Sequence, residues 1–180
     1  VSTEKRSSDR GKERRRSSRA VSVIRCVTRA DIALLVKILG EEFWYESNAY
    51  IHFGEYDPLS VQRALDQHLT SGLVVGWASF AEDGEINGAL LAMKDKCLWK
   101  NLSFLKEIGW YTAKGMRGQI SSFKLYREME KFAFKNGFDH IIMARIKGVP
   151  SYDKLDGFYR KLNFKSLEET YIKCLNAKPA

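Results

Sequence analysis

The sequence has few cysteines and no long apolar run, and each shortage excludes a class of protein. Three cysteines in 180 residues, with no CxxC pair and one left unmatched, exclude a disulfide framework and a zinc knuckle. The three histidines lie far apart without the spacing of metal ligands, so we expect no metal site. No apolar run approaches the ~20 residues that span a bilayer. The composition therefore predicts a soluble protein of a reducing cytoplasm.

The residues that are present suffice for one domain with an unevenly charged chain. Hydrophobic residues make up 44% of the chain and aromatic residues 12%, which is enough for one continuous core. The formal net charge is +8, and the segment Val1 to Ala20 carries eight Lys/Arg against three Asp/Glu. We therefore expect a domain over 21–180 and a separate basic arm over 1–20.

The arm has almost nothing apolar to bury, so ordering it would cost backbone entropy without return. We expect it to be flexible. Its basic cluster comprises Arg14, Arg15, Arg16 and Arg19. Three interpretations stay open: binding to nucleic acid, contact with an acidic face of another protein, or a solvated tail without a partner. Binding through phosphates would depend on salt and not on base sequence.

In the first half of the chain, apolar spacing and turn residues predict two helices and a hairpin. The β-branched run 21–27 predicts a strand, and a helix follows from Ile32 to about Tyr45. Asp57-Pro58 is a cap followed by proline at the first helical position, which predicts a second helix ending near Ser71-Gly72. Two strands, 73–80 and 86–94, should form a hairpin around Asp83-Gly84.

The second half predicts strands that alternate with helices. We expect a strand within 102–112 with Gly109 as a bulge or a close-approach point, and a long helix over 122–136 that ends at Gly137. A buried strand over 140–146, a helix over 153–162 and one or two strands over 164–175 complete the order. Such alternation is an α/β pattern.

The turn Arg117-Gly118-Gln119-Ile120-Ser121-Ser122 opens the long helix and is the strongest candidate site. Successive backbone N–H groups and the helix dipole at such a turn can hold a pyrophosphate. Arg117 adds a fixed cation, and the hydroxyls of Ser121 and Ser122 are further donors. The alternative is an ordinary helix entry that binds nothing.

Two further blocks follow at a characteristic distance: Ala133-Phe134-Lys135-Asn136-Gly137 and Phe158-Tyr159-Arg160-Lys161-Leu162-Asn163-Phe164. With these blocks the chain resembles the GNAT acetyltransferase superfamily over about 21–175. The resemblance implies an α/β GNAT fold, which is a central mixed twisted sheet of about six to seven strands with helices on both faces. It also implies acetyl-CoA as co-substrate, bound by the 117–122 turn.

The resemblance implies transfer of an acetyl group to a small amine or a protein amino group, with the thioester between the strands 108–112 and 140–146. Backbone N–H groups of Tyr111, Thr112 and Ala113 would polarise the thioester carbonyl. Tyr159 would protonate the departing thiolate, and Glu107, the acidic residue on its strand, is our candidate base. Each has a structural alternative: Glu107 as a solvated edge charge and Tyr159 as a core aromatic residue.

The connection over 43–56 is dense in aromatic and polar side chains. In GNAT relatives it commonly borders the acceptor, so Tyr45, Glu46, Tyr50 and His52 are candidate substrate contacts. Its acidic residues suit a cationic acceptor. An aromatic lid over the core is the alternative interpretation.

The turn also departs from the family pattern, which expects glycine near Ile120 and glycine or alanine near Ser122. An isoleucine side chain at a close-approach position predicts weaker CoA binding. A second function therefore stays open: a catalytically degenerate GNAT-like structural or interaction protein. With Trp110-Tyr111 ending the strand, the chain looks like GNAT-like proteins of tailed bacteriophages. In that case it would be a virion component whose arm contacts nucleic acid or neighbouring subunits.

Overall fold

The computed structural model describes residues 23–117, 120–146 and 152–173. The predicted basic arm and its four arginines lie outside these residues. No helix in the described part of the chain is long and apolar enough to cross a bilayer.

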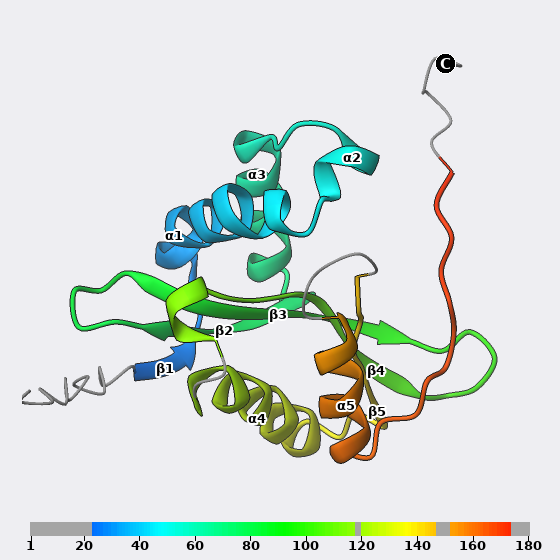
Figure 1. Cartoon of the computed structure of the whole chain (residues 1–180). Helices are drawn as coiled ribbons and strands as arrows, with labels where there is room; N and C mark the ends of the chain where they lie inside the picture. Colours follow the sequence, from blue (N-terminus) through cyan, green and yellow to red (C-terminus); the bar gives the residue numbers. More distant parts are fainter. Residues whose placement is uncertain (1–22, 118–119, 147–151, 174–180) are drawn as a thin grey trace, which may run out of the picture.

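A five-stranded sheet in the order β1-β2-β3-β4-β5 forms the centre of the described chain (Figure 1). The first four strands are antiparallel neighbours, whereas β5 runs parallel to β4. Because β5 alone joins the sheet in parallel, it reaches the edge through the crossover helix that precedes it. The strands are β1 (Val23–Cys26), β2 (Val74–Phe80), β3 (Ile86–Lys96), β4 (Ser103–Thr112) and β5 (His140–Ile142).

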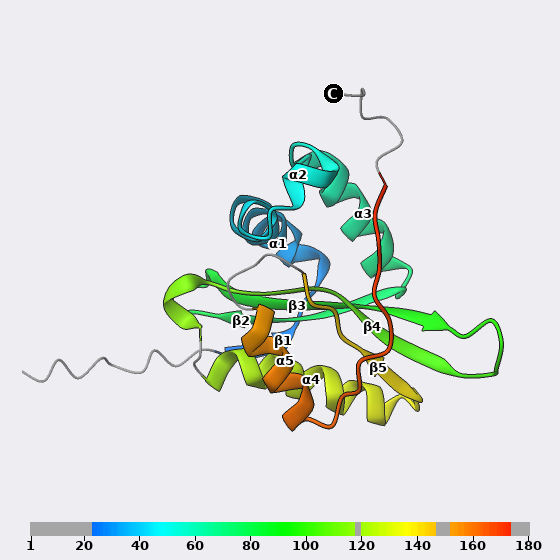
Figure 2. The ribbon, with the colours of Figure 1, turned by 45° about the vertical axis from the view of Figure 1, so that its right-hand side comes forward.

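Helices cover both faces of the sheet (Figures 1 and 2). The helices α1 (Ile32–Lys37), α2 (Ala49–Phe53) and α3 (Pro58–Thr70) lie on one side. On the other side lie α4 (Ile120–Lys135) and α5 (Tyr152–Lys161). Two apolar clusters fill the layers, one around Leu35 and the other around Leu125. The predicted α/β architecture with helices on both faces is confirmed.

Helix α3 begins where the sequence predicts a helix, directly after Asp57. Asp57 accepts hydrogen bonds from the backbone N–H groups of Leu59 and Ser60, both at 3.1 Å, and Pro58 stands in the first turn. The carboxylate thus satisfies donors that the helix leaves unpaired. The hairpin around Asp83-Gly84 is also confirmed, with Gly84 at φ +84°.

The helix predicted from Ile32 to about Tyr45 is not one continuous α-helix. After α1 the chain widens into π-type turns over Ile38–Trp44. Tyr56 lies against this part, because a Cβ atom on Gly40 would meet its ring at 1.9 Å. Its hydroxyl donates to the Val36 carbonyl at 2.9 Å. A side chain that takes a helix carbonyl loosens the backbone ladder, which accounts for the wider turns.

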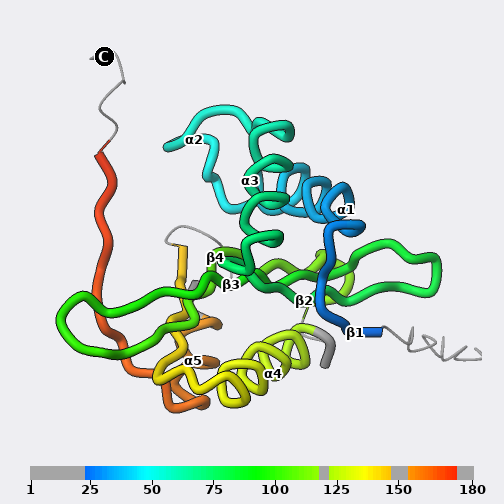
Figure 3. The backbone as a smooth tube through the Cα atoms, turned by 180° about the vertical axis from the view of Figure 1, so that it is seen from behind, coloured from blue at the N-terminus to red at the C-terminus, as the bar shows by residue number. Residues whose placement is uncertain are grey.

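The end of the chain corrects the prediction of six to seven strands. No strand occurs over 164–173, where one or two strands were expected, and the sheet of the described residues has five. Phe164 still packs against the apolar cluster around Leu125, and beyond it Figures 1 and 3 show the chain standing apart from the two helical layers. Leu167 and Tyr171 are exposed. The apolar residues of the segment do not alternate with polar ones, so the sequence gives it little period-two strand signal, and in the described chain it pairs with no other strand.

We predict that Asp31→Ala lowers the free energy of unfolding by about 2 kcal/mol at pH 7. The buried carboxylate pairs with Arg25 and accepts from the Thr28 backbone N–H, which together lower its pKa from 3.8 to about 2. This stabilisation is present above pH 4 and lost as the pH falls through about 2. Urea denaturation at pH 7 and pH 2.5 measures it. Asp66→Ala, which removes the exposed pair with Arg29, should cost less than about 1 kcal/mol, and an equal loss in both variants would contradict the assignment.

Candidate active site

The parallel strands β4 and β5 pair only over a short stretch and then part. Their ladder runs from Phe104 opposite His140 to Lys106 opposite Ile142. β4 continues to Thr112, while the chain after Ile142 leaves the strand, so the prediction of a strand to Ile146 is too long. The bulge, predicted at Gly109, falls at Ile108, because Leu91 faces Gly109 and Ala92 faces Glu107. A bulge bends its strand, and here it bends β4 where the two strands separate.

Glu107 is the first β4 residue beyond the ladder, and its carboxylate contacts the segment that follows β5, where the two strands part. It is 9% exposed and accepts a hydrogen bond from the Ala144 backbone N–H at 3.1 Å. Burial raises its pKa from 4.5 to about 7, and the Ala144 hydrogen bond opposes this only in part. A carboxyl of this kind exchanges its proton near neutral pH, which a solvated edge charge does not do.

Tyr159 of α5 contacts the same backbone segment. It is 8% exposed, and its hydroxyl donates to the Ala144 carbonyl at 3.0 Å. Burial and the nearby charge of Glu107 raise its pKa above the usual range, so the hydroxyl stays protonated. The two predicted catalytic residues therefore meet at the N–H and C=O of Ala144.

Ala144 and its neighbour Arg145 were not among the predicted site residues. Ala144 contributes only backbone atoms, and a backbone contact leaves no mark on residue type. Arg145 pairs with Asp156 of α5 at 3.2 Å and acts against the rise in the Tyr159 pKa. Arg145 and Asp156 come from different segments of the chain, so only folding brings this cation beside α5.

The end of β4 corrects one predicted donor. The Ala113 N–H already donates to the Asn87 carbonyl at 2.9 Å, so it is not free for a ligand. N–H groups of a strand point alternately to its two sides, so the Tyr111 N–H also faces β3. The Thr112 N–H faces the opened side. Of the three predicted backbone donors, Thr112 alone has the right direction.

Thr112 also connects the strand to the start of α4. Its hydroxyl accepts from the Ser122 hydroxyl at 3.0 Å, and its carbonyl accepts from Arg117 Nε at 2.8 Å. Gly118 and Gln119 lie outside the described residues. Ile120 and Ser121 begin α4, but their side chains are likewise outside the description, so the expected effect of the isoleucine stays a prediction.

The Arg117 guanidinium is paired with Glu46, a residue predicted for the acceptor. Nη2 donates to Oε2 at 2.6 Å, and a second short bond joins Nη1 to Oε1. The guanidinium lies 5.2 Å from the centroid of the Tyr111 ring. The Tyr111 hydroxyl in turn donates to Glu42 at 2.6 Å and contacts Glu46 at 3.3 Å. Glu42 was not among the predicted residues, and its place becomes clear only from the three-dimensional contact.

The other predicted acceptor residues stay at the surface near α2. The Tyr45 hydroxyl donates to Glu55 at 3.0 Å, and the ring lies 5.8 Å from that of Tyr50. His52 is exposed and contacts the Phe53 ring. Of the four residues, the structure brings only Glu46 into contact with β4.

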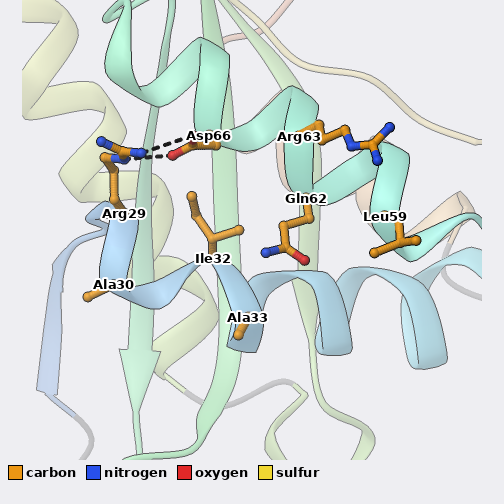
Figure 4. Close-up of a pocket in the computed structure, with 8 residues that line it drawn as sticks. All are labelled: Arg29, Ala30, Ile32, Ala33, Leu59, Gln62, Arg63 and Asp66. Carbon is orange, nitrogen blue, oxygen red and sulfur yellow. Dashed lines mark hydrogen bonds and ion pairs between the residues drawn. The ribbon is translucent and has the colours of Figure 1, made fainter.

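A hollow of about 600 Å³ lies between α1 and α3, away from the strand opening (Figure 4). The Arg29–Asp66 ion pair closes one end of it. None of the residues predicted for the site lines this hollow. Within the described ranges, no three His, Cys, Asp or Glu side chains gather where they would hold a metal ion.

No family model matches the sequence, and no curated protein does. Solved structures match the fold at low identity. A predicted acetyltransferase from Clostridium acetobutylicum with acetyl-CoA has a TM-score of 0.66 and 18% identity, over 86% of this chain and 97% of that one. A ribosomal-protein-alanine N-acetyltransferase from Brucella melitensis biovar Abortus 2308 has a TM-score of 0.63 and 12% identity, over 86% and 100%.

The same fold also occurs under another description. A transcriptional regulator from Bacillus halodurans C-125 matches with a TM-score of 0.69 and 21% identity, over 86% of this chain and 100% of that one. Identities this low show a shared fold and leave the activity to be argued from the site. The chain has the GNAT acetyltransferase fold.

Proposed function

We propose that this chain is an acetyl-CoA-dependent N-acetyltransferase. The observation that carries the proposal is Glu107, a buried carboxyl with a pKa of about 7, set in the opening between two parallel strands opposite Tyr159. A shared fold alone would leave many functions open. A near-neutral acid–base group in the opening favours chemistry that removes a proton at physiological pH.

The residues of the opening divide the work of acyl transfer. Acetyl-CoA supplies an acyl group activated as a thioester. Glu107 accepts a proton from an incoming ammonium or amine, directly or through a water. The Thr112 N–H faces the opened side and is placed to donate to the acyl oxygen. Tyr159, kept protonated by burial, donates a proton to the leaving sulfur.

The carrier fits at the start of α4, beside the end of β4. The first turn of a sixteen-residue helix offers unpaired N–H groups and a positive dipole end. We assign the carrier's diphosphate to the 117–122 turn, with Arg117 and the Ser122 hydroxyl as the described side-chain ligands. The acceptor amine belongs on the α1 side of β4, where Glu42 and Glu46 lie beside Tyr111.

A second candidate is a GNAT-fold interaction protein without catalysis. The observation that favours it is the Arg117–Glu46 pair, because the cation assigned to the diphosphate is already neutralised. The shared fold of the Bacillus halodurans regulator is compatible with such a role.

Acetyl-CoA should raise the thermal stability of the protein if the carrier binds. A ligand at ~100 times its dissociation constant adds ~2.7 kcal/mol, which is roughly 5–10 °C for a chain of this size. Differential scanning fluorimetry measures it. Arg117→Ala should lose most of the shift, whereas Arg63→Ala, an exposed arginine on α3, should keep it. No shift at millimolar acetyl-CoA favours the second candidate.

Tyr159→Phe should leave acetyl-CoA binding intact and slow release of the CoA thiol by about 10²- to 10⁴-fold, since a proton donor is lost. The assay measures free thiol with a panel of primary amines as acceptors. Tyr171→Phe, which alters an exposed tyrosine, should keep the wild-type rate. Unchanged turnover in Tyr159→Phe would rule out this residue as the acid.

Glu107→Gln should abolish a pH dependence of stability that needs no substrate. In the folded wild type the proton is held up to about pH 7, whereas an ordinary carboxyl releases it near 4.5. The resulting stabilisation is full below 4.5 and is lost as the pH rises through about 7, a total of about 3 kcal/mol. Urea denaturation from pH 4.5 to 8 measures it. Glu82→Gln, at an exposed turn, should behave as wild type, and an unchanged slope in Glu107→Gln would refute the assignment.

A further inference from the structure

Arg117 and Glu46 join two segments that lie far apart in the sequence. Glu46 follows the π-type turns of the first helical layer, and Arg117 precedes α4. All three guanidinium nitrogens are engaged: Nη1 and Nη2 by Glu46, and Nε by the Thr112 carbonyl. The planar fork of an arginine fits a carboxylate and a phosphate in the same two-bond manner. Glu46 thus occupies the bonds that a diphosphate would use.

The pair is partly shielded from water, so the two charges attract each other more strongly than in a fully exposed ion pair. The Glu46 side chain is 24% exposed and that of Arg117 is 39% exposed. The Tyr111 ring lies beside the guanidinium, and the Tyr111 hydroxyl contacts the same carboxylate. Arg117 lowers the pKa of Glu46, so the carboxylate is ionised at neutral pH. The Glu46–Arg117 ion pair is therefore formed at neutral pH.

The Glu46–Arg117 pair adjoins the proposed carrier site. Thr112 bonds Arg117 through its carbonyl and Ser122 of α4 through its hydroxyl. Thr112 thus contacts both the guanidinium and the first turn of α4. A diphosphate at that turn meets a cation that is within reach but already neutralised.

We propose that Glu46 is a built-in competitor of the carrier's diphosphate for Arg117, so that carrier binding breaks the Glu46–Arg117 pair and frees Glu46 for the acceptor. This inference rests on the proposed function. Once freed, Glu46 stands beside Glu42, which already accepts from the Tyr111 hydroxyl. Two adjacent carboxylates attract a cationic acceptor. The carrier therefore raises the affinity for a cationic acceptor, and the acceptor raises that for the carrier by the same factor.

Glu46→Gln tests the competition, because the amide keeps the side-chain shape and gives up the charge. Isothermal titration of the full chain with coenzyme A should give a dissociation constant about five-fold or more below that of wild type. Glu42→Gln is the matched control: it removes a neighbouring charge that contacts Tyr111 and not Arg117. Its dissociation constant should stay within about two-fold of wild type, since a purely long-range effect is screened by salt.

A double-mutant cycle makes the test specific to Arg117. In an Arg117→Ala background, Glu46→Gln should leave coenzyme A binding unchanged, because no guanidinium remains to be released. Equal binding of wild type and Glu46→Gln, or an equal gain with Arg117 absent, would overturn the competition while the proposed function stands. Absence of coenzyme A binding in every variant would overturn both.

Discussion

The separation of β4 from β5 is the constraint on which the proposed site depends. A parallel pair that stops after Lys106 and Ile142 leaves backbone groups on both strands without a ladder partner. Buried N–H and C=O groups need partners, and here side chains supply them. The Glu107 carboxylate accepts from the N–H of Ala144, and the Tyr159 hydroxyl donates to its C=O. The opening thus gathers an acid–base pair because the sheet ends its own pairing there.

Glu107 and Glu46, two carboxyl groups near β4, have pKa values shifted in opposite directions because their surroundings differ. Glu107 is buried and faces a single N–H, so its pKa rises to about 7. Glu46 is more exposed and faces a guanidinium, so its pKa falls. One is suited to exchange a proton and the other to hold a cation. Environments that push the pKa values of nearby groups apart are typical of active sites.

The sequence predicts the parts of the fold that rest on local signals. Asp57-Pro58 marks a helix start, Asp83-Gly84 a hairpin, and the apolar spacing of Phe123, Tyr126 and Met129 a long helix, and the structure confirms all three. Glu107 and Tyr159 were also named, through the family resemblance. Pairings between distant segments could not be predicted, since Glu46 and Arg117 are linked only by folding. The one or two strands expected over 164–175 do not occur in the described part, 164–173, because a strand needs a paired neighbour that local sequence does not specify.

The state of Glu107 is the claim from which the proposed chemistry follows, and it can be observed at one atom. Carboxyl ¹³C NMR of the side chain, assigned by comparison with Glu107→Gln, follows its titration without any substrate. We expect a midpoint at about pH 7. A midpoint near 4.5, the ordinary value for glutamate, would contradict it.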